Sequence, residues 1–158
     1  AVIALTRNAI EAGGQDKRIW ITGHSLGGAL CSLYAGMLIE NGMSVFGIYT
    51  FASPRPGTPA FAAQFNDRVD GPLHRVVNDG DIVPHLPPEP FFSHSGERTI
   101  LKAHKRERSK SSWWKQRVNA LKEFVAATGN RLDIKDNHVL AGDDESYIPR
   151  LINDLKRL

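Results

Sequence analysis

Residues 18–29 read RIWITGHSLGGA, and this stretch decides the fold. The apolar run over residues 18–22 predicts a short buried strand, and residues 26–40 predict a helix that begins almost at once. Between them lies a Gly-x-Ser-x-Gly pattern with Ser25 at its centre. A serine on a sharp turn from strand to helix exposes its hydroxyl at the top of a sheet, so the stretch predicts a nucleophile elbow.

The chemistry of a serine nucleophile explains the residues around Ser25. A serine hydroxyl reacts poorly until a base takes its proton. Gly23 and Gly27 lack side chains, which predicts that strand and helix approach each other closely there. The N–H of Leu26 lies at the start of the helix, whose positive end stabilises a developing oxyanion. The alternative is a glycine-rich turn without chemistry, and the flanking strand and helix argue against it.

Apolar periodicity predicts the remaining elements. Strands and helices alternate, which is typical of an α/β fold with a mostly parallel central sheet and helices on both faces, here as a single domain over residues 1–158. In the helix over residues 26–40 the larger apolar residues fall on one face: Leu26, Leu30, Leu33, Met37 and Leu38. The other expected elements are helices over residues 2–12, 59–66, 111–127 and 144–157, and strands over residues 45–52, 73–77 and, as two short pieces, 91–101.

Two candidate acids follow the strand over residues 73–77. A serine nucleophile on such a sheet needs an acid and then a histidine further along the chain, both in loops at the same edge. Asp79 lies closer to the strand, and Asp81 directly precedes Ile-Val-Pro. Position alone leaves both open, and both also fit as ordinary turn residues.

Among the six histidines, His138 is the favoured base. It follows a short extended stretch over residues 132–134 and precedes the last helix, which is where the base of such a site belongs. His94, in an expected hairpin, is the alternative. The others fit less well: His24 lies within the elbow and is expected to face away from this role, His74 lies within a strand, His85 follows the acids closely, and His104 lies in a basic run.

Composition excludes several classes of protein. The 158 residues carry a net charge of only +3, which does not indicate nucleic-acid binding. A single cysteine, Cys31, excludes an internal disulfide framework, and no spacing of residues predicts a metal site. No apolar run is long enough for a bilayer and no signal peptide is visible, which favours the cytoplasm. The chain starts at Ala1 without a Met, however, so the compartment stays open.

Several motifs together resemble the class 3 lipases, the fungal-lipase-like branch of the α/β-hydrolases. The resemblance covers most of the chain from about Arg18 to Leu155 and rests on these stretches: residues 21–29 (ITGHSLGGA), 51–57 (FASPRPG), 75–78 (RVVN) leading to 81–84 (DIVP), Pro87-Pro88, 94–97 (HSGE), and His138 followed by Tyr147. It implies a serine esterase or lipase that forms an acyl-enzyme on acylglycerol-type lipids and needs no cofactor. The family's acid directly precedes Ile-Val-Pro, which implies Asp81 rather than Asp79, and its base corresponds to His138.

The resemblance also implies what this chain lacks. Members of the family have further strands, a lid helix and a second oxyanion donor before the elbow, whereas only about 22 residues precede it here. We therefore expect an upstream segment of the same protein, or a second copy, to complete the fold. A lipid–water interface is a further expected partner. The basic run over residues 102–110 would suit anionic headgroups, although a solvated loop is the favoured explanation. The alternative functions are a phospholipase A1 or galactolipase, and a non-catalytic lipase-like module that binds lipid or protein.

Overall fold

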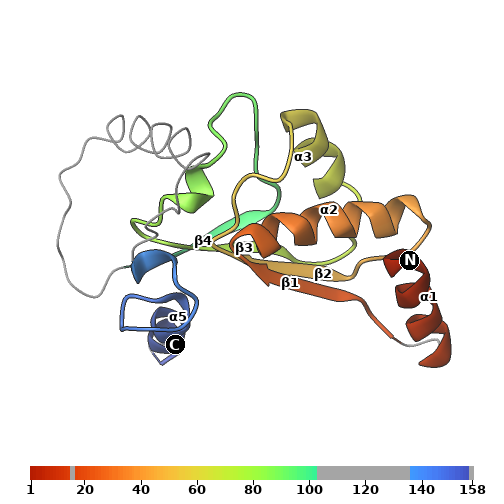
Figure 1. Ribbon diagram of the computed structural model, residues 1–158, viewed down its shortest axis with the longest axis horizontal. Coiled ribbons are helices and arrows are strands. Elements are labelled where there is room, and N and C mark those ends of the chain that lie inside the picture. Colours follow the sequence, from red (N-terminus) through yellow and green to blue (C-terminus); the bar gives the residue numbers. More distant parts are fainter. Residues whose placement is uncertain (15–16, 103–135, 157–158) are drawn as a thin grey trace.

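A computed structural model describes residues 1–14, 17–102 and 136–156 (Figure 1). The expected helix over residues 111–127, the extended stretch over 132–134 and all of the basic run after Lys102 lie outside these residues. The described elements follow one another in this order: α1 (Val2–Ala12), β1 (Trp20–His24), α2 (Leu26–Glu40), β2 (Gly47–Phe51), α3 (Pro59–Asn66), β3 (Leu73–Asn78), the 3-10 turn η1 (Val83–His85), β4 (Glu97–Leu101), the 3-10 turn η2 (Asp136–His138) and α5 (Tyr147–Leu155).

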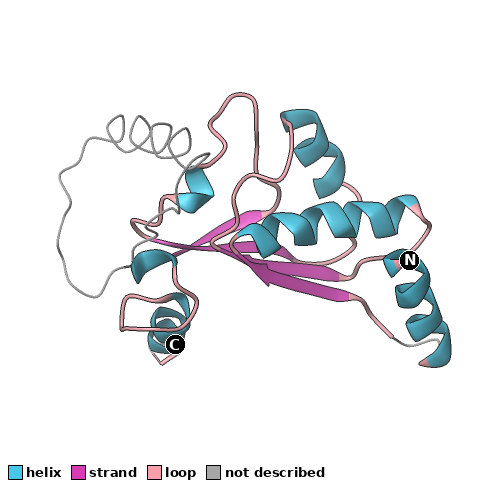
Figure 2. Cartoon of the chain, in the orientation of Figure 1, coloured by secondary structure: helices cyan, strands magenta, loops and turns pink. Residues whose placement is uncertain are grey.

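The four described strands form one parallel sheet in the order β1-β2-β3-β4 (Figure 2). The two central strands bury apolar residues such as Ile48 and Val76, as expected where helices cover both faces. Because parallel strands share one direction, the loops that follow their carboxyl ends gather at a single edge of the sheet. Three of the predicted site residues lie in those loops.

Most of the expected elements are confirmed. The helices over residues 2–12, 26–40 and 59–66 have the predicted bounds, and the strand ends shift by no more than two residues. Helix α3 begins where predicted because the side chain of Thr58 accepts a hydrogen bond from the N–H of Phe61 and Pro59 occupies the first turn. The last helix begins at Tyr147 rather than at residue 144, because the Asp143 side chain accepts a hydrogen bond from the N–H of Glu145 in a preceding turn.

The prediction of two short strands within residues 91–101 was wrong. Only β4 forms there, and it pairs in parallel with β3, while Ser93 makes an isolated antiparallel bridge with Gly57. Gly96 turns the chain into β4 with a φ of +77°, and a Cβ at this position would lie 2.4 Å from the carbonyl oxygen of Leu73. Only glycine fits such an approach. His94 lies before this turn, in a loop and not in a hairpin.

Helices cover both faces of the sheet (Figure 1). On one face α2 and α3 pack on the sheet through a core of Ala35, Leu38, Val45, Ile48 and Phe65. On the other face Tyr147 of α5 packs against three residues of the sheet and its loops: Ala52, Val76 and Leu101. Helix α1 lies beyond the amino ends of the strands. Within the described ranges, none of these helices has the length and apolarity needed to cross a membrane.

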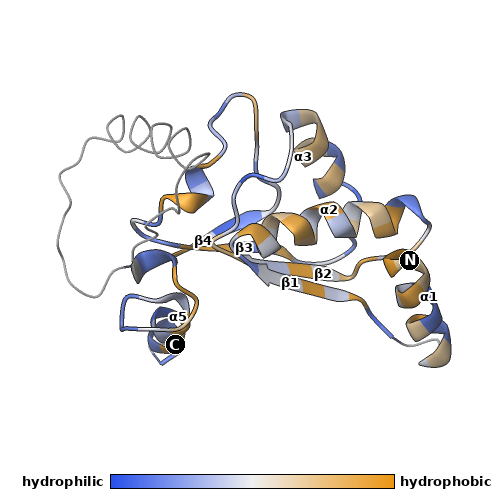
Figure 3. Ribbon diagram, viewed as in Figure 1, coloured by the Kyte–Doolittle hydropathy of each residue, from blue (hydrophilic) through white to orange (hydrophobic). Residues whose placement is uncertain are grey.

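Helix α2 buries its small residues rather than its large ones. Of the five large apolar residues grouped on one face, only Leu38 is buried, whereas Leu30 is 54% exposed. The residues against the sheet are Gly28, Ala29, Cys31, Ser32, Ala35 and Leu38. Small residues are needed because helix and sheet lie close together: a Cβ on Gly28 would lie 2.7 Å from that of Ser53. Apart from Leu38, the large apolar residues therefore lie on the exposed side of a helix that is apolar along most of its length (Figure 3).

Alanine substitutions at Leu38 and Leu30 test this placement of α2. Leu38→Ala removes a fully buried side chain and should lower the free energy of unfolding by about 2–5 kcal/mol. Leu30→Ala should change it by less than about 0.5 kcal/mol, because that side chain is exposed. Denaturant titration followed by circular dichroism measures both. An equal loss at the two positions would contradict the exposed placement and would mean that another surface covers Leu30.

Candidate active site

Ser25 occupies the turn between β1 and α2 with a strained backbone. Its φ of 56° and ψ of −130° are unusual for a residue with a side chain and cost about 1–3 kcal/mol. The turn is anchored because the Ser25 N–H donates to the carbonyl oxygen of Phe51 at 2.9 Å. The serine side chain is thus held at the carboxyl edge of the sheet, as the elbow pattern predicts.

The glycines of the elbow have unequal roles. A Cβ on Gly23 would lie 2.5 Å from the carbonyl oxygen of Gly27 and 2.6 Å from Sγ of Cys31, so strand and helix touch at this residue. A Cβ on Gly27 would meet no described atom within 4 Å. The prediction that both glycines allow the close approach is therefore right for Gly23 and wrong for Gly27. Gly28, outside the five-residue pattern, is the second point of contact.

The structure brings Ser25, His138 and Asp81 into one hydrogen-bonded chain. The Ser25 hydroxyl donates to Nε2 of His138 at 2.7 Å. The opposite ring nitrogen, Nδ1, donates to the Asp81 carboxylate, with distances of 3.1 Å to Oδ1 and 3.0 Å to Oδ2. His138 and Asp81 are both buried, so the interaction between them is little screened by water.

Two further donors fix the Asp81 carboxylate. The Val83 N–H donates to Oδ1 at 3.0 Å and the Tyr147 hydroxyl donates to Oδ2 at 2.6 Å. The same hydroxyl accepts a hydrogen bond from the N–H of Asn78 at 3.0 Å. Burial, followed by the nearby Asp81 charge, raises the pKa of Tyr147, so it remains a donor. From the sequence, Tyr147 stands out only by its place after His138 in the resemblance.

The competing candidates lie elsewhere. The Asp79 side chain is exposed. Its backbone N–H donates to the carbonyl oxygen of Leu101 at 2.9 Å. His94 donates from Nε2 to the carbonyl oxygen of Pro84 at 2.7 Å. Burial, followed by the charge of Arg75, lowers the pKa of His94 to about 4. Neither residue joins the chain of hydrogen bonds that starts at Ser25.

A buried arginine and an asparagine, both missed from the sequence, hold the loop that carries His138. The Asn78 side-chain amide donates to the carbonyl oxygens of Asn137 at 2.9 Å and Glu145 at 3.0 Å. Arg150, only 1% exposed, donates to the Asn137 side chain at 3.3 Å and forms an ion pair with Glu145. One signal was available: Arg150 lies three residues after Tyr147, on the side of α5 that an amphipathic pattern buries.

Leu26 opens α2, and its side chain is 67% exposed. The first N–H groups of a helix have no partner within the helix, and the Ser25 side chain does not cap them. An oxyanion next to Ser25 would therefore meet the Leu26 N–H and the positive end of the helix. Among the described residues, no group of three histidine, cysteine or acidic side chains is placed to hold a metal ion.

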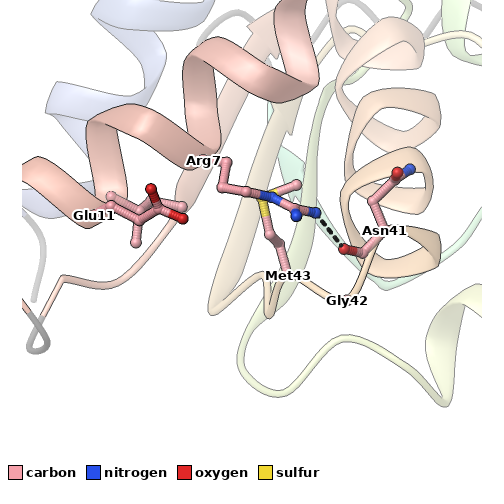
Figure 4. Close-up of a pocket in the computed structure, with 6 residues that line it drawn as sticks. Arg7, Glu11, Asn41, Gly42 and Met43 are labelled. Carbon is pink, nitrogen blue, oxygen red and sulfur yellow. Dashed lines mark hydrogen bonds between the residues drawn. The ribbon is translucent and has the colours of Figure 1, made fainter.

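Two surface hollows lie away from Ser25. One, of about 310 Å³, is lined by residues of α1 and of the α2 carboxyl end, where Arg7 donates to the carbonyl oxygen of Asn41 (Figure 4). The other, of about 530 Å³, lies between α2 and α3 beside Met37 and Phe61. Neither hollow includes a residue of the Ser25–His138–Asp81 chain.

A strained serine between a parallel strand and a helix, with a histidine and an acid from later loops at the same edge, is the arrangement of the α/β-hydrolases. Solved structures of this fold match the chain. The native propeptide complex of the Rhizomucor miehei lipase superposes with a TM-score of 0.57 at 39% identity, covering 63% of this chain and 33% of that one. A triacylglycerol lipase with a serine protease triad as its catalytic centre gives a TM-score of 0.56 at 38% identity, covering 63% and 38%.

This chain belongs to the class 3 lipase family, whose model matches residues 4–91. Among curated relatives, a lipase of Rhizomucor miehei is 47% identical over 85 residues, which cover 51% of this chain and 23% of that lipase. A secreted mono- and diacylglycerol lipase of Malassezia globosa is 40% identical over 79 residues, covering 48% and 25%. The chain thus spans about a quarter of the length of these relatives.

Alanine at Gly23 and at Gly27 should have opposite effects on stability. Gly23→Ala forces a Cβ against backbone, which should cost about 1–3 kcal/mol of unfolding free energy. Gly27→Ala meets open space within a helix, where alanine is better than glycine by about 0.5–1 kcal/mol. Thermal and denaturant unfolding of the two variants measures the difference. If Gly27→Ala proves as damaging as Gly23→Ala, the helix approaches the strand differently from the structure described.

Proposed function

We propose that this chain carries the reacting residues of a serine esterase that hydrolyses carboxylic ester bonds of acylglycerol-type lipids. The observation that carries the proposal is the unbroken chain of hydrogen bonds from Ser25 through His138 to Asp81. In this order the serine is next to a base, and the base is next to an acid that orients it, which is what activation of a serine requires.

The proposed reaction begins when Oγ of Ser25 attacks the ester carbonyl carbon. Nε2 of His138 takes the hydroxyl proton, and Asp81 stabilises the imidazolium through Nδ1–H. The carbonyl oxygen becomes an oxyanion that faces the Leu26 N–H at the start of α2. The Tyr147 hydroxyl and the Val83 N–H share the Asp81 charge throughout and keep the carboxylate in place.

The second half of the reaction uses the same groups in reverse. The tetrahedral intermediate collapses, the bond to the alcohol breaks, and Nε2 of His138 gives its proton to the departing alkoxide. An acyl-enzyme remains on Ser25. Water then attacks the acyl carbon as His138 takes one of its protons, and collapse of the second intermediate releases the fatty acid and returns the proton to Ser25. All of these steps use protein groups and water alone.

The substrate class is inferred from the relatives and from the surface beside Ser25. The relatives that match this chain are named as lipases, among them a secreted mono- and diacylglycerol lipase and a triacylglycerol lipase. The exposed residues of α2 begin directly after the nucleophile, with Leu26 and then Leu30. An apolar surface at that place suits a lipid–water interface better than a water-soluble ester.

We also propose that residues 1–158 are a single but partial hydrolase domain that another segment completes. Within the described sheet, β1 pairs only with β2, and Trp20 on β1 is 51% exposed. An open strand edge beside an exposed aromatic side chain favours pairing with further chain. An upstream segment of the same protein, or a second copy, would supply the second oxyanion donor and any lid.

Replacing Ser25 by alanine tests the proposed nucleophile. In the intact protein Ser25→Ala should reduce hydrolysis of a short p-nitrophenyl ester by at least about 10³-fold while the melting temperature stays close to that of the unmodified protein. Ser44→Ala, at an exposed serine away from the site, is the matched control and should keep full activity. An intact protein that binds lipid vesicles yet neither hydrolyses esters nor reacts with a fluorophosphonate would instead be a non-catalytic module.

Asparagine at the two neighbouring acids separates their roles. Asp81→Asn should lower kcat by about 10⁴-fold, because an amide cannot hold the Nδ1–H tautomer of His138 as a carboxylate does. Asp79→Asn should have a much smaller effect, because that side chain is exposed. Steady-state kinetics on the same ester gives both values. A greater loss from Asp79→Asn would make Asp79 the orienting acid.

A further inference from the structure

His24 connects the end of β1 to the backbone of the histidine that Ser25 contacts. Its Nε2 lies 2.6 Å from the carbonyl oxygen of His138, although 114 positions separate the two residues. A carbonyl oxygen can only accept a hydrogen bond, so Nε2 of His24 carries the proton and donates. His24 is not the residue that contacts the Ser25 hydroxyl, but its ring points at the backbone of the residue that does.

The ring of His24 also packs against the site. Its centroid lies 4.9 Å from that of the His138 ring, with the two planes tilted by 40°. It meets the ring of Tyr147 edge-on at 5.8 Å. His24 thus contacts both the base and the tyrosine that donates to Asp81, and it limits where both rings can lie.

The geometry of the base explains why this contact matters. The imidazole of His138 must reach Ser25 at 2.7 Å and Asp81 at 3.0 Å at the same time. Its position depends on where the backbone of His138 lies, and that backbone belongs to a 3-10 turn of only three residues. His24 is the last residue of β1 and directly precedes Ser25. A hydrogen bond from His24 to the His138 carbonyl therefore fixes the base relative to the nucleophile itself.

The lowered pKa of His24 favours a neutral ring at this contact. The titratable groups that face His24 are His138, Asp81 and Tyr147. Burial is the main cause that lowers the pKa of His24. It outweighs the hydrogen bond to the His138 carbonyl and the charge of Asp81, which both raise the pKa. A neutral ring with its proton on Nε2 can donate to the carbonyl without repelling the positive charge that His138 acquires when it takes the serine proton.

We propose that His24 is a positioning residue for the general base, which holds the backbone of His138 at the distance from Ser25 that proton transfer needs. The inference rests on the function proposed above. Its plainer alternative is that His24 merely fills space beneath the His138 loop. The two differ in what they require of the side chain, since positioning needs an N–H donor at the place of Nε2 and packing needs only volume.

Glutamine and asparagine at position 24 separate these roles in the intact protein. The amide nitrogen of glutamine can take the place of Nε2, whereas that of asparagine ends at the place of Nδ1 and cannot reach the carbonyl. His24→Asn should lower kcat on a short p-nitrophenyl ester by about 10²-fold with little change in KM, because misplacement of a reacting group by about 1 Å has that effect. His24→Gln should regain most of the loss. His85→Gln, at an exposed histidine, is the matched control and should leave kcat unchanged.

Nitrogen-15 NMR of the histidine rings gives a readout that does not depend on turnover or on any variant. In the unmodified protein His24 should be found as the Nε2–H tautomer at neutral pH, and His138 as the Nδ1–H tautomer. An Nδ1–H tautomer at His24 would overturn the proposal even if every variant failed to fold.

The outcomes also separate this inference from the proposed function. If His24→Asn keeps full kcat while Ser25→Ala is inactive, the function stands and the positioning role is overturned. If His24→Gln and His24→Asn lose kcat equally while both melt like the unmodified protein, a donor at this place is not what matters, and the proposal is again overturned. If Ser25→Ala remains active, the proposed function itself fails, whatever the His24 variants do.

Discussion

The site depends on one buried charge, the carboxylate of Asp81. A carboxylate that is only 3% exposed is costly unless donors surround it. Here the donors come from widely separated parts of the chain: the Val83 N–H from the turn after β3, the His138 ring from η2, and the Tyr147 hydroxyl from α5. The need to satisfy this one group brings three segments to the same edge of the sheet.

The strained turn at Ser25 fits the same arrangement. Its unfavourable backbone is held because β1 pairs with β2, because its N–H bonds to Phe51, and because Gly23 lets α2 lie directly against the strand. The nucleophile is therefore positioned by the sheet, whereas the acid and the base are positioned by loops. His24 lies where these two systems meet, since it belongs to β1 and bonds to the loop of His138.

Local patterns in the sequence predicted the local features well. The elbow, three helix bounds and the central strands follow from apolar periodicity and from glycine and proline positions, which act over a few residues. The choice of Asp81 over Asp79 needed the resemblance, because two acids in one turn look alike until their surroundings are known. The bonds from Arg150 to Leu101 and from His24 to His138 could not be predicted, because the partners lie far apart in sequence and only the fold brings them together.

The errors have a common physical cause. Helical spacing places the large apolar residues of α2 on one face, yet a helix packed tightly on a sheet buries small residues, and Leu30 remains outside. The short apolar pattern over residues 91–101 fits a hairpin, but it fits equally a parallel strand that a long connection joins to its neighbour. The structure has the parallel strand β4. Periodicity predicts that a face is apolar, but the partner of that face decides whether it is buried.

The buried guanidinium of Arg150 has a consequence for how this protein can diverge. It bonds to the carbonyl oxygen of Leu101 at the end of β4 and to the side chain of Asn137 next to His138. One side chain thus ties together the two ends of the segment between them. The backbone next to His138 can therefore shift only together with α5 and the end of β4. Position 150 can diverge only if the new side chain keeps both contacts.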